Sequence, residues 1–276
     1  MILRVLALAL LLGAVGAAAL WVFGPREPVV TDRRFDPARL ADGVDPYLAA
    51  AETDVPNLRP AARKRVVWAG APEVRAPWAV VYVHGFSASA EEVRPLPDRV
   101  AARLGANLVF TRLAGHGRDG PAMAEATVAD WMDDMAEALA IGRAAGERVL
   151  VIGTSTGGTL AALAAHEAMA EGVAGLVLIA PNFRVRAAGA ALLTWPAARL
   201  WLPWLIGAER GFDPVTEGQA AHWTTRYPST AVLPMAASVA AARALPHEDA
   251  AIPALFVFDP DDTVVDHEAT EAVAAR

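Results

Sequence analysis

From about residue 65 onward, the chain alternates short, continuously apolar runs with longer segments whose apolar positions recur at helical spacing. The continuous runs lie at residues 79–83, 107–111, 149–152, 176–179 and 254–258. Such runs are typical of strands that are buried on both faces of a parallel sheet, and the intervening helices make the right-handed crossovers that this sheet needs. The pattern therefore predicts an α/β fold with a mostly parallel sheet flanked by helices.

Polar residues mark the expected starts of two helices. Ser89 followed by Glu92 has the spacing of a capping box, and predicts a helix that begins there. Thr127 followed by Asp130 has the same kind of spacing, and apolar residues follow it at helical intervals. A third helix is predicted over residues 156–169, directly after the central apolar run.

About 70 residues separate the last two predicted strands, far more than an ordinary connection needs. This stretch, at about residues 183–252, contains four tryptophans, and two prolines interrupt its most apolar part at residues 192–206. Active-site lids commonly lie on insertions of this kind, so the stretch predicts a helical cap over a functional site. Additional core packing is the alternative.

Residues 5–23 form an unbroken apolar run, long enough to cross the roughly 30 Å hydrocarbon core of a membrane as a helix. A signal peptide cleaved near residues 17–19 is the alternative, but the apolar residues continue past that point, which favours an uncleaved anchor. Arg4 is the only charge before the run, so the rest of the chain is expected on the non-cytoplasmic side, periplasmic if the chain is bacterial. Cleavage would instead release a secreted protein.

The pattern divides the chain into three parts: a membrane anchor or signal peptide at 1–24, a linker at 25–60 with a short helix near 47–51, and an α/β domain at 61–276. The formal net charge of −7 argues against electrostatic binding of nucleic acid. The chain has no cysteine, and its six histidines lack metal-ligand spacing. We expect no metal and no cofactor, and the sequence does not indicate an oligomeric state.

The candidate chemistry lies at Ser155, within the sequence Gly-Thr-Ser-Thr-Gly-Gly of residues 153–158. A serine between glycines, directly after a strand and directly before a helix, is the pattern of a nucleophile elbow. The glycines avoid clashes in the tight turn, and the helix N-terminus favours negative charge. A plain glycine-rich turn is the alternative. The motif predicts that Ser155 attacks a carbonyl carbon.

A second motif, His-Gly-Phe-Ser at residues 84–87, ends the first apolar run. Acyl transfer creates an oxyanion, which preorganised backbone N–H groups stabilise. We expect the donors to be the N–H groups of Phe86 and Thr156, because Gly85 lets the loop approach closely. His84 is expected to brace the loop rather than act as a base, since it precedes the nucleophile and the usual chain order is Ser, acid, His.

These two motifs, together with Arg-Leu-Ala-Gly-His-Gly at residues 112–117, resemble the bacterial carboxylesterase and monoacylglycerol-lipase branch of the α/β hydrolases. Serine aminopeptidase-like members are similar too. The resemblance runs from about residue 66 to the end of the chain. It implies an α/β-hydrolase fold with a cap, and a loop-bracing role for His116. Thr156 stands where the family often has Met, a mild departure because the required group is a backbone N–H.

The resemblance places the catalytic acid at Asp262, in the acidic segment that follows the predicted strand 254–258. Asp259 and Asp261, in the same segment, are the alternatives, whereas Asp266 fits a helix N-cap better. The acid would orient an imidazole and stabilise its protonated form.

No histidine stands where the resemblance requires the catalytic base, which is on a loop after a further strand beyond the acid. His267 is the only histidine after Asp262, and it lies at a predicted helix start. His222 and His247 precede the acid, which is the wrong order. We therefore expect the chain to be C-terminally truncated, with the last strand and the catalytic His in the missing part. Recruitment of His267 and a non-catalytic fold are the alternatives.

Together these features predict a membrane-anchored serine hydrolase that cleaves a carboxylic ester through an acyl-enzyme intermediate. The tryptophan-rich cap suggests an apolar, lipid-like acyl group. The expected partners are a small-molecule ester and the membrane. A peptidase or thioesterase with the same triad is one alternative, and a non-catalytic hydrolase-fold protein that binds a ligand is another.

Overall fold

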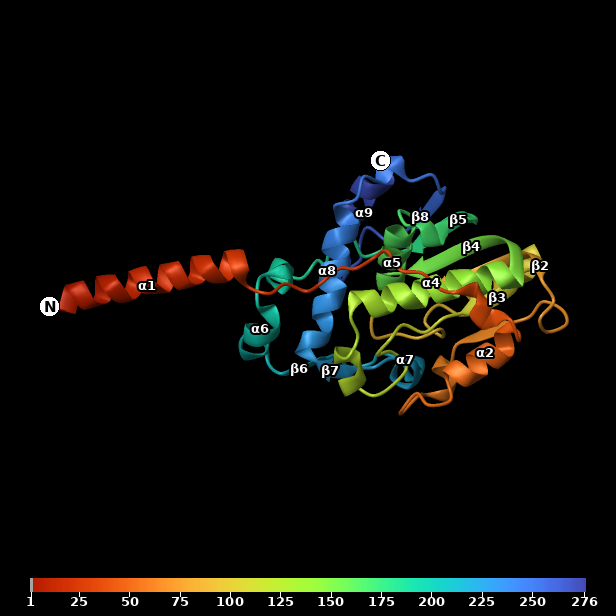
Figure 1. Ribbon diagram of the computed structural model, residues 1–276, viewed down its shortest axis with the longest axis horizontal. Coiled ribbons are helices and arrows are strands. Elements are labelled where there is room, and N and C mark those ends of the chain that lie inside the picture. The colour runs from red at the N-terminus through yellow and green to blue at the C-terminus, as the bar shows by residue number, and fades with distance from the viewer. Residues whose placement is uncertain (1) are drawn as a thin grey trace.

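The computed structural model describes residues 2–276, and its centre is a six-stranded sheet flanked by helices (Figure 1). In spatial order the strands are β1 (Arg65–Val67), β3 (Asn107–Phe110), β2 (Ala76–Val83), β4 (Gly146–Thr154), β5 (Val173–Ile179) and β8 (Ala254–Val257). Every pairing is parallel except that of β1 with β3. The predicted α/β architecture with a mostly parallel sheet is confirmed.

All five predicted strands are present, and the central ones are longer than their apolar runs. β4 begins at Gly146, several residues before the predicted run, because β2 pairs with it along that whole length. The antiparallel strand β1 was not predicted from the sequence, since three residues carry too short a pattern. At the other edge, the side chains of Leu255 and Val257 in β8 are 59% and 48% exposed. No strand within residues 2–276 pairs with the outer side of β8.

Helices cover the two faces of the sheet unequally. The larger hydrophobic core packs the sheet against α4 (Val128–Ala145), α5 (Thr156–Ala164) and α8 (Val232–Arg243), and it includes residues of α2 (Val44–Ala51) and α9 (His267–Ala274). The smaller core, on the opposite face, packs β2 and β3 against α3 (Leu96–Leu104). Alternate residues of β2 divide between the two cores, as expected for a strand buried on both sides.

The capping signals were correct at one helix and wrong at the other. Thr127 and Asp130 form the predicted capping box at the start of α4. Ser89 and Glu92 do not, because α3 begins only at Leu96 and the Glu92 carboxylate instead accepts hydrogen bonds from Gly85 and Tyr82. α5 ends at Ala164, short of the predicted residue 169, and the short 3-10 helix η4 (Ala168–Ala170) follows.

The long stretch between β5 and β8 is mainly helical. It contains η5 (Ala190–Thr194), α6 (Ala198–Ile206), the small hairpin of β6 (Glu209–Gly211) with β7 (Arg226–Pro228), α7 (Glu217–His222) and α8. Its last helix, α8, packs on α5 and contributes to the larger core. α6 also contributes Ala198 and Leu202 to this core, whereas the β6–β7 hairpin and α7 contribute no buried residue to it.

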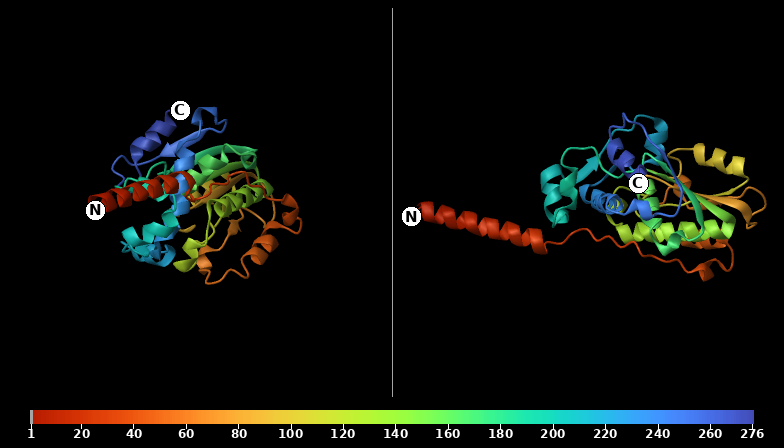
Figure 2. Two further views of the ribbon diagram at one scale, coloured as in Figure 1. Left: turned by 60° about the vertical axis from the view of Figure 1, so that its left-hand side comes forward. Right: turned by 90° about the horizontal axis from the view of Figure 1, so that it is seen from above.

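Helix α1 (Ile2–Phe23) projects away from the domain, as Figures 1 and 2 show. Residues 4–23 have a mean hydropathy of 2.5, and none of this window is buried, so length and composition are sufficient for a membrane span. The linker that follows runs along the surface of the domain (Figure 2, right). Arg33 forms a paired hydrogen bond with Asp133 of α4 at 2.7 and 2.6 Å, and Thr31 donates to Glu167 at 2.5 Å.

Candidate active site

Ser155 occupies a strained turn between the end of β4 and the start of α5. Its backbone has φ +49° and ψ −116°, a region that non-glycine residues rarely adopt. The Ser155 N–H donates to Ile179 O at 2.9 Å, which ties the turn to the end of β5. A Cβ atom at Gly157 would lie only 2.1 Å from Val83 O, so only glycine fits there. This is the geometry predicted for a nucleophile elbow.

The loop at residues 84–87 approaches the elbow closely. A Cβ atom at Gly85 would lie 3.3 Å from Ser155 Cβ. Within residues 2–276, the N–H groups of Phe86 and Thr156 have no hydrogen-bond acceptor. Both groups are therefore free to donate to an oxygen atom bound at Ser155, and the start of α5 adds the positive end of its dipole.

Glu92 joins this loop to the elbow through a hydrogen-bond network. Its Oε2 atom accepts from Gly85 N–H at 2.7 Å and from the Tyr82 hydroxyl at 2.9 Å. The Tyr82 hydroxyl also lies 3.1 Å from that of Thr154, the residue before Ser155. Desolvation of the carboxyl group raises the pKa of Glu92 to about 7, although both hydrogen bonds act in the opposite direction.

Sequence reasoning missed Glu92, because it assigned the residue to a helix start. Glu92 could have been found as an acidic residue shortly after the His-Gly motif, in a segment whose apolar residues do not recur at helical spacing. The Glu92 network links the loop at residues 84–87, the proposed oxyanion loop, to the turn at Ser155.

His84 and His116 are buried and bonded to backbone groups. His84 Nε2 accepts from Leu113 N–H at 3.2 Å, so its Nδ1 atom carries the proton and donates to Gly85 O at 2.9 Å. His116 Nδ1 lies 3.0 Å from Ala114 O. Burial lowers the pKa of His84 to about 4 and that of His116 to about 3, so both rings are neutral near pH 7. These contacts fit the expected bracing roles.

Asp262 lies in the turn that follows β8, at the same edge of the sheet as the elbow. Its Oδ1 atom accepts from Val264 N–H at 2.7 Å and Val265 N–H at 2.9 Å. Asp259 makes a similar local bond to the N–H of Asp261, at 2.9 Å. The side chain of Asp266 caps α9 by accepting from Glu268 N–H. The structure thus assigns Asp266 the N-cap role expected for it, and Asp262 a turn at the carboxyl end of β8.

No imidazole within residues 2–276 forms a hydrogen bond with the Ser155 hydroxyl or with Asp262. His267 is the first residue of α9, and its Nδ1 atom is buried with no partner in the described part of the chain. His247 packs against His166 and Phe183, and His222 ends α7. In the same residues, no group of three or more His, Asp or Glu side chains could hold a metal ion.

The hairpin end of the cap covers the oxyanion loop. Thr224 N–H donates to Ser87 O at 2.7 Å, and the rings of Phe86 and Tyr227 meet edge to face with centroids 5.3 Å apart. On its other side Phe86 contacts Trp131, at 6.4 Å between centroids. The backbone donor at residue 86 is therefore held between the cap and the core.

Several solved structures share this fold. One comes from work on LipS and LipT, two metagenome-derived lipolytic enzymes. Its sequence is 25% identical to this chain, the match covers 79% of this chain and 84% of the other, and the TM-score is 0.64. A monoglyceride lipase from Saccharomyces cerevisiae is 13% identical, with coverages of 76% and 77% and a TM-score of 0.55. A monoacylglycerol lipase from Paleococcus ferrophilus is 15% identical, with coverages of 76% and 82% and a TM-score of 0.53.

A search of the curated proteins found no match. A comparison with protein families matches residues 75–276 to the family described as serine aminopeptidase, S33. The match spans the loop at residues 84–87, the turn at Ser155 and the acidic turn after β8. The chain therefore belongs to the serine aminopeptidase S33 family (Hydrolase_4) of α/β hydrolases, in its esterase, lipase and aminopeptidase-like branch.

Proposed function

We propose that this protein is a serine hydrolase that cleaves carboxylic esters through an acyl-enzyme intermediate. The observation that carries the proposal is Ser155, held with φ +49° on a glycine-flanked turn, with two unbonded N–H groups at the adjoining backbone. The lipolytic relative at 25% identity supports ester hydrolysis over other acyl transfers.

In the proposed reaction, Ser155 Oγ attacks the ester carbonyl carbon and the alcohol leaves. The N–H groups of Phe86 and Thr156 stabilise the negative charge on the carbonyl oxygen. Water then attacks the acyl-enzyme, which releases the acid and regenerates Ser155. Asp262 is the proposed acid that orients the histidine base. His267 is the only histidine between Asp262 and residue 276.

The proposed substrate carries an apolar acyl group, and α1 is proposed to anchor the enzyme in a membrane with the hydrolase domain on the non-cytoplasmic side. The apolar, unburied window at residues 4–23 supports the anchor. The single positive charge before it supports the orientation. Fractionation of the full chain with alkaline carbonate tests the anchor, because an integral protein stays with the membrane pellet.

One alternative has specific support. Because no imidazole within residues 2–276 forms a hydrogen bond with Ser155, a hydrolase-fold protein that binds an ester without turning it over also fits the geometry. The two functions differ in whether Ser155 reacts.

A fluorophosphonate probe with the full chain distinguishes them. We expect covalent labelling of the parent, loss of labelling in Ser155→Ala, and retention in the control Ser89→Ala, which removes another serine hydroxyl near the loop. Labelling that persists in Ser155→Ala would refute the nucleophile. A parent that binds ester but shows neither labelling nor turnover would favour the binding protein.

A further inference from the structure

Helix α6 is apolar on its buried side and on its exposed side. Ala198 and Leu202 are buried, and Trp201 packs against the larger core with its Nε1 donating to Pro196 O. Leu200 and Trp204, four residues apart on the opposite side, are 71% and 91% exposed, and Leu205, near the end of the helix, is 62% exposed. A helix that is apolar all round normally contacts protein or lipid on every side, and a tryptophan this exposed has no partner within residues 2–276.

The start of α6 is attached to the end of α1. The rings of Trp21 and Trp195 meet edge to face with centroids 5.4 Å apart. Arg26 lies 5.3 Å from the Trp21 ring and donates to Thr194 O at 3.1 Å. Ala197 N–H donates to Pro25 O at 2.6 Å. Both views of Figure 2 and Figure 1 place α6 on the side of the domain from which α1 projects.

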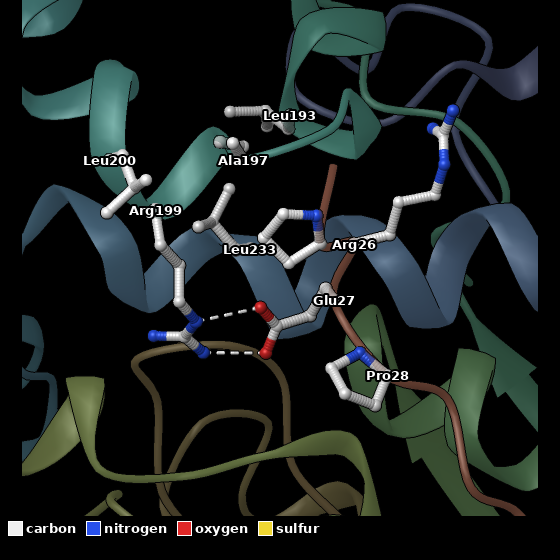
Figure 3. A pocket seen from close by; sticks show the side chains of 10 residues that line it. Arg26, Glu27, Pro28, Leu193, Ala197, Arg199, Leu200 and Leu233 are labelled. Atoms are coloured by element: carbon white, nitrogen blue, oxygen red, sulfur yellow. Dashed lines mark hydrogen bonds and ion pairs between the residues drawn. The ribbon is translucent and has the colours of Figure 1, made fainter. Parts of the chain in front are cut away.

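An ion pair strengthens the same junction. Glu27 accepts two hydrogen bonds from Arg199, at 2.9 and 2.6 Å, and the Glu27 side chain is almost completely buried. Figure 3 shows this pair beside a cavity of about 290 Å³ that lies between residues 25–28, α6 and Leu233 of α8. The cavity lining is mostly apolar, and Leu200 belongs both to it and to the exposed side of α6. The cavity therefore adjoins the exposed apolar side.

We infer that the exposed side of α6, formed by Leu200, Trp204 and Leu205, lies in the interfacial layer of the lipid bilayer that α1 enters. The inference rests on the proposed anchoring of α1. Since α6 is bonded to the residues that immediately follow α1, a membrane that holds α1 also meets α6. The bilayer interface accommodates tryptophan, whose ring is amphipathic, and leucine, whose apolar side chain enters the acyl boundary.

Tryptophan fluorescence in lipid vesicles tests this directly. The full chain is reconstituted in phosphatidylcholine vesicles with or without lipids brominated near the headgroup, since bromine quenches tryptophan within contact range. Trp204→Leu keeps the apolar surface and removes the fluorophore. We expect the bromine-quenched part of the emission to fall in this variant. In the control Trp78→Leu it should stay unchanged, because Trp78 lies in β2, at the far side of the domain from α1 (Figure 1).

An unchanged quenched emission in Trp204→Leu would overturn the inference, as would burial of Trp204 in a dimer of the chain. Carbonate extraction separates this failure from failure of the anchor. A chain that stays in the membrane while Trp204 is not quenched retains its anchor and loses only the α6 contact, whereas a chain that carbonate extracts loses both. Labelling of Ser155 reports on the proposed chemistry independently of either result.

Discussion

Replacing Glu92 with Gln should change how stability depends on pH. In the folded chain, burial raises the pKa of this carboxyl from its ordinary 4.5 to about 7. The folded protein therefore holds a proton on Glu92 that the unfolded chain releases between these two values. The free energy of unfolding of the parent protein should therefore fall as the pH rises from about 4.5 to 7, and it should stay at the lower level above pH 7.

The size of the effect follows from the pKa difference. Each pKa unit corresponds to about 1.4 kcal/mol, so the Glu92 contribution to the change across this range is at most about 3 kcal/mol. Glutamine keeps an oxygen that can accept from Gly85 and Tyr82 but does not titrate. The stability of Glu92→Gln relative to the parent should thus increase by up to about 3 kcal/mol between pH 5 and pH 8.

Urea unfolding of both proteins at a series of pH values, followed by circular dichroism, measures this difference. Glu91→Gln is the control, because it removes the neighbouring carboxylate, which pairs with Arg65 and Arg94 at the surface. Parallel pH curves for Glu92→Gln and the parent would refute the reasoning. A shift of equal size in both Gln variants would show that the effect does not depend on the bond to Gly85.

Three further changes test other contacts. Gly157→Ala places a Cβ atom 2.1 Å from a backbone oxygen of β2, so it should lower the free energy of unfolding by about 3 kcal/mol or more. The control Gly70→Ala should have little effect, because no atom lies within 4 Å of a Cβ at that position. Equal urea midpoints for the two variants would contradict this prediction. Lys64→Met removes the cation that pairs with Asp134 and Glu137 of α4, and should lower the free energy of unfolding by about 3–5 kcal/mol in urea. A decrease below about 1 kcal/mol would argue against a structural role for these ion pairs. Trp201→Ala should change selectivity between short and long acyl esters by about 1–3 kcal/mol, because Trp201 packs against the core. Trp204→Ala should leave turnover of water-soluble esters unchanged, because Trp204 is exposed. A larger change in selectivity for Trp204→Ala than for Trp201→Ala would count against an inward-facing role for Trp201.

The sequence predicts the central sheet well, because strands buried on both faces must be apolar at successive positions, as residues 149–152 are. It predicts the elbow for a related reason, since the tight turn at Ser155 leaves no room for a Cβ atom two residues before it, at Gly153, or two residues after it, at Gly157. Both signals are local, so a single chain is enough to find them.

Signals that depend on distant neighbours fail in the same sequence. Glu92 has the right spacing for a capping box with Ser89, but it instead accepts from Tyr82 of β2 and from Gly85, outside the four-residue span of a capping box. The orientation of Trp201 and Trp204 could not be predicted either, because Pro203 lies between them and the buried side of α6 depends on what the helix packs against.

The route of the linker determines how far the α/β domain can move from α1, the proposed anchor. A free extended chain over residues 25–43 could span roughly 60 Å and would let the domain rotate and search a wide area. Here the linker is instead bound to the domain, at Arg199 by Glu27 and at Asp133 by Arg33. It acts as a rigid brace rather than a flexible tether. These contacts hold the linker, and with it the end of α1, against the domain.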